Sequence, residues 1–347
     1  MAEIVIYRYG HRPARDKRIT THVALTARAM GAGSIIIDTG DRGIEENIVA
    51  VNRNFGGHFK VQTGVSIERF FNSLGNNDLL VHLTMYGKPI MEKIEEIKEA
   101  SREKDRIVVF VGAEKVPGIA YAKSNFNISV TSQPISEVSA LAIFLDRFLD
   151  GNELKNEMKG RLDINPNERG KTIEYFPDGR DCMEILLNRG ANDRLIEHCV
   201  AVNEVAIIIS EKVDCDRRVV NAASLLHDVG RTVTNDIKHA LEGYRICEEE
   251  HISKKISEAV LKHTGAGITR DEAMELGLPD LDFMPETIEE KIVACADNLV
   301  IGNRRIDINE QVQRYKNKGL DKAATRIKEL YEYVSSEAKM DINEIEI

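Results

Sequence analysis

The stretch RIVVFVGAEKVPG (residues 106–118) joins an apolar, β-branched run to a turn that carries glycine. Such a short run, bounded by small residues, predicts a buried strand followed by a loop. Helix-like segments such as KPIMEKIEEIKEASREKD (88–105) lie between further runs of this kind. The other runs are EIVIYRY (3–9), SIIID (34–38), KVQTGV (60–65), LLVHLTM (79–85) and NISVTS (127–132). The alternation predicts a parallel sheet covered by helices, from residue 3 to about residue 150.

Three of the predicted strands run directly into small or polar residues, in HLTMYG (82–87), VGAEKVPG (111–118) and TSQPISE (131–137). Open parallel sheets bind ligands at the carboxyl ends of their strands. Small residues there leave room for an adenosine without side-chain clashes. Taken alone, each segment is as readily an ordinary turn as part of a nucleotide site.

A segment rich in Gly, Asn, Pro and charge, residues 149–180, separates two halves of different character. Its composition is typical of a connection between domains. Beyond it, stretches such as LIEHCVAVNEVAIIISEKV (195–213) show helical periodicity. We therefore expect an α/β domain over residues 1–165, a linker over 166–185 and an all-α domain over 186–347.

Charge is distributed unevenly over the 347 residues, whose net charge is −10. Residues 1–165 hold 22 Lys and Arg against 21 Asp and Glu, a sum of +1, which leaves 25 against 36, a sum of −11, for residues 166–347. Only the first half is therefore suited to face RNA. No run approaches the roughly 18 apolar residues that a membrane helix needs, so we expect a cytoplasmic protein.

A basic segment, GHRPARDKRITTHVALTARAMGAG (10–33), follows the first predicted strand. From Arg8 to Arg28 the chain contains six cationic side chains and the single acid Asp16. Guanidinium groups bind phosphates well, so the segment suits a nucleic-acid ligand, although a solvated basic loop would have the same composition.

Four motifs occur in one order in the first half: the basic segment, VHLTMYGKP (81–89), VGAEKVP (111–117) and SQPISEVSALAIFLDR (132–147). Together they resemble the archaeal SPOUT-class tRNA methyltransferases that modify the ribose 2′-hydroxyl of the T-loop cytidine at position 56. The resemblance covers residues 3–165. One departure is Ile135, where we expect the family to carry histidine after Gln-Pro.

The resemblance implies a trefoil knot, a homodimer and tRNA as substrate, with S-adenosylmethionine as cofactor. Arg28 is the first candidate to orient the ribose and its neighbouring phosphate, and Arg12, Arg15 and Arg18 are weaker ones. Arginine is too basic to be a true base. His22 is either a helper or merely a neighbour of a helix start. The implied cofactor-binding residues are Leu83, Gly112, Ala113, Glu114, Lys115, Val116, Val130, Thr131, Ser132, Gln133, Pro134, Ser136, Glu137 and Val138.

The second half contains an ordered set of histidines and aspartates: His198, the adjacent pair His227 and Asp228, and Asp297. The pair follows the apolar run VVNAASLL, where a charged dyad is costly to bury unless it is paired or liganded. Imidazole and carboxylate suit a divalent cation such as Mn, Mg, Ni, Co or Fe. The pattern predicts a metal site built from several helices.

Residues 190–305 resemble the HD phosphohydrolase superfamily, with HDVGR (227–231) as its dyad motif. The resemblance implies that these four residues bind the metal and that His239, His263 and Arg231 bind phosphate or a second metal. A single histidine at 263 favours one metal. We expect hydrolysis of a phosphate ester, with a small phosphorylated molecule as substrate. The alternative is a non-catalytic module for ligand sensing or tRNA docking.

Overall fold

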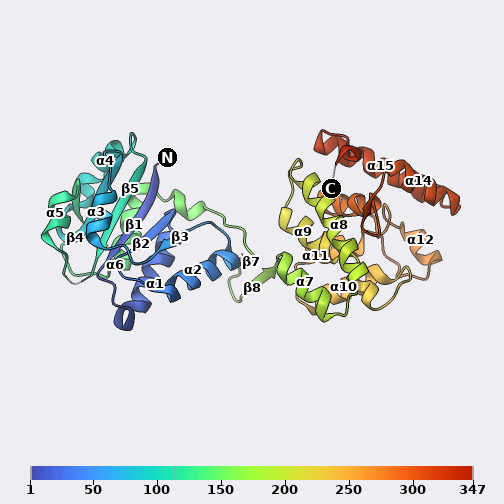
Figure 1. Ribbon diagram of the computed structural model, residues 1–347, viewed down its shortest axis with the longest axis horizontal. Helices are drawn as coiled ribbons and strands as arrows, with labels where there is room; N and C mark the ends of the chain where they lie inside the picture. The colour runs from blue at the N-terminus through green and yellow to red at the C-terminus, as the bar shows by residue number, and fades with distance from the viewer. Residues whose placement is uncertain (1, 114, 346–347) are drawn as a thin grey trace. The chain divides into compact units, whose positions relative to one another are not determined.

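The computed structural model describes residues 2–113 and 115–345. The chain divides into two compact units, residues 1–160 and 161–347 (Figure 1). The first unit is α/β and the second is almost entirely helical, as the sequence predicts. Among the described residues, no helix has both the length and the apolar character that crossing a membrane requires.

A six-stranded sheet forms the centre of the first unit, and all its neighbouring strands are parallel. Its order is β3-β2-β1-β5-β4-β6. The central strands are apolar at nearly every position because helices cover both of their faces. The strands are β1 (Glu3–Tyr9), β2 (Ser34–Ile37), β3 (Lys60–Gln62), β4 (Asp78–Pro89), β5 (Arg106–Gly112) and β6 (Phe126–Ser129).

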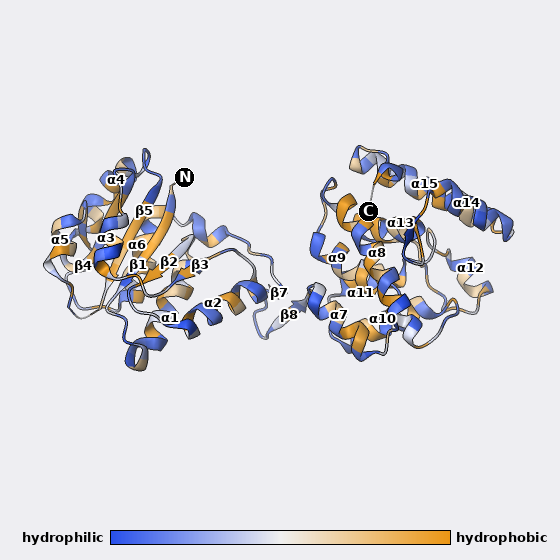
Figure 2. Ribbon diagram, viewed as in Figure 1, coloured by the Kyte–Doolittle hydropathy of each residue, from blue (hydrophilic) through white to orange (hydrophobic). Residues whose placement is uncertain are grey.

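Two separate cores lie on the two faces of this sheet. Ile6 and Phe144 belong to the core that α1, α2, α4 and α6 share with the strands. Tyr7 and Phe110 belong to an aromatic core on the other face, beneath α3 and α5. Figure 2 shows apolar central strands between helices with hydrophilic outer surfaces. The helices are α1 (Pro13–Ala29), α2 (Arg42–Phe55), α3 (Ile67–Ser73), α4 (Ile90–Ser101), α5 (Gly118–Lys123), α6 (Glu137–Leu149) and η1 (Asn152–Lys155).

Strands β4 and β6 cross closely at their carboxyl ends. Leu83 and Lys88 both pair with Ile128, so the residues between them form a bulge within β4. Gly87 lies where the backbone of Asn127 passes, and a Cβ atom at Gly87 would lie 2.5 Å from the Asn127 carbonyl. A side chain at this position would block the crossing. The crossing lies in the region to which the family resemblance assigns a knot.

The second unit begins earlier than the sequence predicts. Strands β7 (Leu162–Asn165) and β8 (Thr172–Tyr175) form an antiparallel hairpin within the expected connection. The helix that follows, α7 (Gly179–Asn188), buries Cys182 and Leu186 in a core of the second unit. Pro166, Asn167 and Gly170, part of the composition that suggested a linker, form the hairpin turn, so this part of the segment belongs to a folded unit.

Helices build the rest of the second unit around two hydrophobic cores. The remaining elements are α8 (Asp193–Ser210), α9 (Arg217–Leu226), η2 (Val229–Thr232), α10 (His239–Glu249), α11 (Lys254–Leu261), α12 (Arg270–Glu275), α13 (Ile288–Asn298), β9 (Val300–Ile301), β10 (Arg304–Arg305), α14 (Ile308–Asn317), α15 (Asp321–Ala338) and η3 (Ile342–Glu344).

Candidate functional sites

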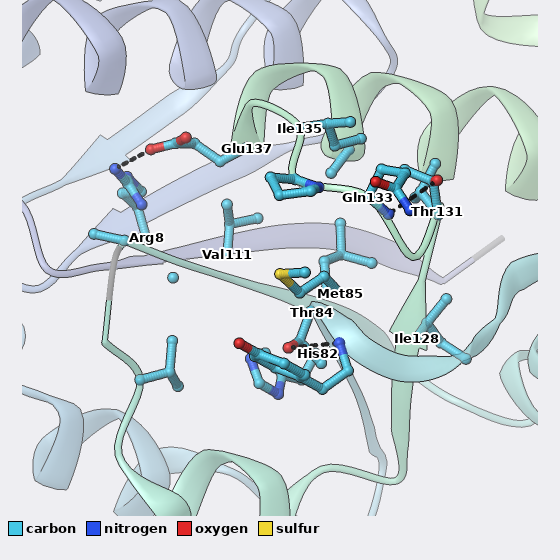
Figure 3. Close-up of a pocket in the computed structure, with 18 of the residues that line it drawn as sticks. Arg8, His82, Thr84, Met85, Val111, Ile128, Thr131, Gln133, Ile135 and Glu137 are labelled. Atoms are coloured by element: carbon cyan, nitrogen blue, oxygen red, sulfur yellow. Dashed lines mark hydrogen bonds and ion pairs between the residues drawn. The ribbon is translucent and has the colours of Figure 1, made fainter.

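A cavity of about 560 Å³ lies at the carboxyl ends of β1, β4, β5 and β6 (Figure 3). Its walls come from the three loops that the sequence singled out and from the start of α1. The volume is within the range of about 300–1,000 Å³ that is usual for small-molecule sites. The position at the carboxyl edge is the one that a parallel sheet favours for ligands.

Most of the predicted cofactor-binding residues line this cavity. They are Leu83, Gly112, Ala113, Val116, Val130, Thr131, Gln133, Pro134 and Glu137. Lys115 and Ser132 are exposed, and Glu114 lies outside the described residues. The Ser136 hydroxyl caps α6 by accepting a hydrogen bond from the Val138 amide. Ser136 and Val138 therefore shape the turn rather than the cavity wall.

The predicted catalytic residues are spread along α1. Arg12 and Arg15, at the start of the helix, line the cavity. The Arg12 guanidinium donates to the carboxylate of Asp16 at 2.6 and 3.2 Å. Arg18 and His22 are exposed and do not line the cavity. The first turn of α1 therefore brings two of the five candidates to the site.

Arg28, the first sequence candidate, lies away from this cavity. It is 8% exposed, and its guanidinium donates to Asn52 Oδ1 at 2.9 Å and to the Gly56 carbonyl at 2.5 Å. Sixteen helical residues separate it from Arg12, which corresponds to about 24 Å along the axis. Both partners lie near the end of α2, so Arg28 joins the carboxyl ends of two helices, where a cation is favoured. In this structure its hydrogen bonds link these helix ends.

Among the cavity residues that were not predicted, Arg8 and His82 are fully buried and polar. Arg8 is the next-to-last residue of β1, is 1% exposed and forms a 2.8 Å ion pair with Glu137. Burial lowers the pKa of Arg8, and the carboxylate of Glu137 opposes this shift. Both residues interrupt apolar strands (EIVIYRY and LLVHLTM), and a polar residue inside such a run is the signal that could have identified them.

In the second unit, four histidines point their Nε2 atoms toward a common centre. Each Nδ1 atom lies 2.6–2.7 Å from a backbone carbonyl: His198 from Gly302, His227 from Ser224, His239 from Asp236 and His263 from Val260. A carbonyl only accepts, so each Nδ1 carries a proton and each Nε2 is the ring nitrogen that faces the centre. This arrangement of outer contacts is typical of metal-binding histidines.

Asp297 and Asp228 complete the cluster. The Nε2 atoms of His198 and His227 lie 3.2 Å apart, and Asp297 Oδ1 lies 3.2 and 3.5 Å from them. Asp228 Oδ2 lies 3.6 and 3.8 Å from the same two nitrogens. The four predicted metal ligands therefore meet at one place.

The two additional histidines stand on the other side of the Asp228 carboxylate. Asp228 Oδ1 lies 3.3 Å from His239 Nε2 and 3.4 Å from His263 Nε2. The Arg231 guanidinium donates to Asp228 Oδ2 at 2.5 Å. All seven residues that the sequence suggested for this site thus lie together, and Asp228 is placed between two groups of histidines.

The carboxylates draw positive charge into this cluster. Burial alone would lower the pKa of His198, but Asp297 and Asp228 outweigh it and raise that pKa to about 9. Burial and the neighbouring His263 lower the pKa of His239 to about 4. The cluster is therefore suited to bind a cation.

The folds and sites define a two-domain protein, in which an α/β unit with a cavity at its sheet edge is joined to a helical unit with an HD-type cluster. A family model described as tRNA ribose 2′-O-methyltransferase matches residues 55–174, and a model of the HD domain matches residues 195–301. Proteins named tRNA (cytidine(56)-2′-O)-methyltransferase from Picrophilus torridus and Thermoplasma volcanium are 50% and 47% identical over 342 residues, which is 99% of this chain and 98% and 100% of theirs. The chain therefore belongs to the tRNA (cytidine(56)-2′-O)-methyltransferase family, and the sequence resemblance is confirmed.

Other relatives of the same name are about half as long. The protein from Methanothrix thermoacetophila is 47% identical over 174 residues, which is 49% of this chain and 96% of that protein. Some proteins with this name therefore match nearly the whole of this chain, and others match only about half of it.

Proposed function

We propose that the first unit transfers a methyl group from S-adenosylmethionine to the ribose 2′-oxygen of cytidine 56 in tRNA. The carrying observation is the sheet-edge cavity built from the same loops that resemble this family. Family membership over the whole chain supports the reaction and the substrate. Relatives of half the length support assigning the reaction to the first unit alone.

The cavity residues fit the proposed cofactor and substrate. When bound, S-adenosylmethionine supplies an electrophilic methyl group on its sulfonium. Arg12 and Arg15 stand at the cavity in a position to hold an RNA phosphate and to stabilise negative charge on the ribose oxygen. The loops after β5 and β6 offer backbone groups at the cavity wall, which suits a cofactor with few charged atoms in its nucleoside.

The test is methylation of an unmodified tRNA transcript by the purified full-length chain with labelled S-adenosylmethionine. We expect label in 2′-O-methylcytidine at position 56. A transcript with 2′-deoxycytidine at that position is the matched control, since it lacks only the accepting oxygen. Label in both transcripts, or in neither, would reject the proposal.

We further propose that the first unit acts as a homodimer. Met85, Tyr86 and Ile135 line the cavity and are 40%, 79% and 43% exposed. Exposed apolar side chains gathered at one place are typical of an interaction surface. A second copy packed there would cover them and close the cavity on its open side.

For the second unit we propose a divalent metal site that hydrolyses a phosphate ester. The carrying observation is the convergence of the Nε2 atoms of four histidines on the two carboxylates Asp228 and Asp297. Asp228 Oδ1 is buried without a hydrogen-bond partner among the described residues. The residues therefore fit a metal. Asp228 Oδ2 faces His198 and His227 while Oδ1 faces His239 and His263, and a carboxylate between two such groups favours two ions over one.

Bound divalent ions would polarise a phosphoryl oxygen and lower the pKa of a bound water. Arg231, beside Asp228, is placed to hold a phosphate oxygen of the substrate. Elemental analysis of the purified protein, followed by hydrolysis of generic phosphoesters with added Mn, Mg, Ni or Co, tests both parts. Metal without hydrolysis of any ester would favour the sensing or docking role, and absence of metal would reject the site.

A further inference from the structure

His82 is a buried polar residue at the aromatic side of the sheet-edge cavity. Its ring is 0% exposed and meets the rings of Phe110 and Tyr121 edge-on, with centroids 5.2 and 4.7 Å away. It lines the cavity together with Tyr121 and Thr84, whose hydroxyls lie 3.0 Å apart. Packing alone would be served as well by an apolar side chain.

The hydrogen bonds around His82 fix which of its nitrogens carries the proton. Nδ1 lies 2.8 Å from Asn127 Oδ1, while Asn127 Nδ2 donates to the Tyr121 carbonyl at 3.0 Å. Turning the Asn127 amide over would set two acceptor oxygens against each other, so Oδ1 must face the histidine. His82 therefore donates from Nδ1, and its Nε2 is a bare acceptor.

This acceptor has no partner within the described part of the chain. Nε2 is among the buried polar atoms that lack a hydrogen bond. Burial also lowers the pKa of His82, so that the ring stays neutral near pH 7. A buried acceptor without a donor is costly, and a residue that lines a cavity can recover that cost from a bound ligand.

The two sides of the cavity differ in chemistry, which indicates the part of a ligand that His82 meets. Arg8 and Glu137 form an ion pair at one side, and Figure 3 shows them apart from His82 and Thr84. An amphiphilic ligand would place charged groups near the ion pair and a flat aromatic ring beside His82 and Tyr121. In S-adenosylmethionine that ring is adenine, whose 6-amino group is a hydrogen-bond donor.

We propose that Nε2 of His82 accepts a hydrogen bond from the 6-amino group of the cofactor's adenine and so selects adenine over a 6-oxopurine. The inference rests on the proposed cofactor site and adds the side chain that recognises the adenine of the cofactor. His82 is a positioning and specificity residue in this proposal. A 6-oxopurine would present an acceptor oxygen to the Nε2 lone pair, which is why it should be rejected.

Titration calorimetry of the full-length protein at pH 7.5 tests the proposal, with S-adenosylhomocysteine and its 6-oxo analogue S-inosylhomocysteine as probes. We expect wild-type protein to bind the adenine compound at least about tenfold more tightly. His82→Asn keeps a donor toward Asn127 but removes Nε2, so the preference should fall to about twofold or less. His82→Gln places an amide oxygen near the position of Nε2 and should restore part of it.

The outcomes separate this inference from the function on which it rests. Tight binding of S-adenosylhomocysteine with no preference in the wild-type protein would overturn the inference alone, because a water would then satisfy Nε2. An unchanged preference in His82→Asn would overturn it as well. No binding of either compound by the folded wild-type protein would reject the cofactor site itself, and the inference with it.

A variant at another position keeps the proposal testable if the His82 variants do not fold. Asn127→Asp would accept from Nδ1 with a charged carboxylate and hold the ring in its protonated form, so that Nε2 becomes a donor. The preference should then shift toward the 6-oxo compound. If the histidine variants fail to fold and Asn127→Asp keeps the wild-type preference, the inference is wrong.

Discussion

Removing the carboxylate of Glu137 should destabilise the first unit much more than removing an exposed carboxylate. The Arg8 side chain is 1% exposed and that of Glu137 27% exposed. Breaking a fully buried pair costs about 3–5 kcal/mol, which the partial exposure of Glu137 reduces to about 2–3 kcal/mol. Glu137 is also the first residue of α6, where a negative charge contributes a further ~0.3–1 kcal/mol. For Glu137→Ala we therefore expect a loss of about 3 kcal/mol.

Differential scanning calorimetry of the full chain measures this effect. A loss of about 3 kcal/mol lowers the melting temperature of a unit of this size by roughly 6–12 °C. Glu99→Ala is the matched control, because Glu99 pairs with Arg102 on the surface at 69% and 73% exposure and should cost at most about 1 kcal/mol. The transition of the second unit should stay in place in both variants.

A double variant distinguishes an unpaired charge from lost packing. Arg8→Met with Glu137→Leu removes both charges and should regain most of the stability, since apolar pairs of similar volume replace buried ion pairs at little cost. It should still lose methyl transfer, because the charged side of the cavity is gone. A melting temperature for Glu137→Ala no lower than that of Glu99→Ala would refute the reasoning.

The other predictions concern both units. Asp228→Ala should abolish bound metal in elemental analysis, whereas His251→Ala, at an exposed position, should retain it; full metal in Asp228→Ala would contradict the ligand assignment. Arg15→Ala should lower kcat/KM for tRNA roughly tenfold or more at unchanged melting temperature, while Arg28→Ala should chiefly lower the melting temperature; the reverse pattern would restore Arg28 as the ribose-orienting residue. Light scattering should give twice the chain mass of 39.0 kDa, and a monomer at micromolar concentration would exclude the dimer. Arg106 lowers the pKa of the Asp78 carboxyl, so the unfolded chain binds the proton more readily and stability should fall with pH below about 4; Asp78→Asn should flatten this acid slope in urea titrations, and an unchanged slope would assign it to other groups.

The sequence predicted the parallel sheet and the cavity loops because both follow from local patterns. Apolar runs mark buried strands, and the glycine-bearing ends of these runs mark the carboxyl edge. The cluster of histidines and aspartates could also be predicted, since a charged His-Asp pair after an apolar run is costly to bury unless it is paired or liganded. Its two-sided arrangement could not, because only the fold shows that Asp228 stands between His239 and His227.

Arg28 and His82 show what sequence reasoning could not place. Arg28 belongs to the same motif as Arg12, but nearness in a motif does not reveal that a straight helix carries it about 24 Å away. His82 lies in an apolar strand, and its importance depends on Asn127, a partner 45 residues away. Contacts of this kind depend on strand order, which periodicity does not encode.

With the proposed cofactor site, the crossing of β4 and β6 would couple the availability of S-adenosylmethionine to the lifetime of the folded protein. The cavity wall exists only after two segments 45 residues apart have been brought together, a closure that is slow to form. A ligand that binds only the finished wall adds about 2.7 kcal/mol of stability at a hundred times its Kd. A cell short of S-adenosylmethionine would therefore lose both the methyl donor and, through faster proteolysis of opened chains, the enzyme that uses it.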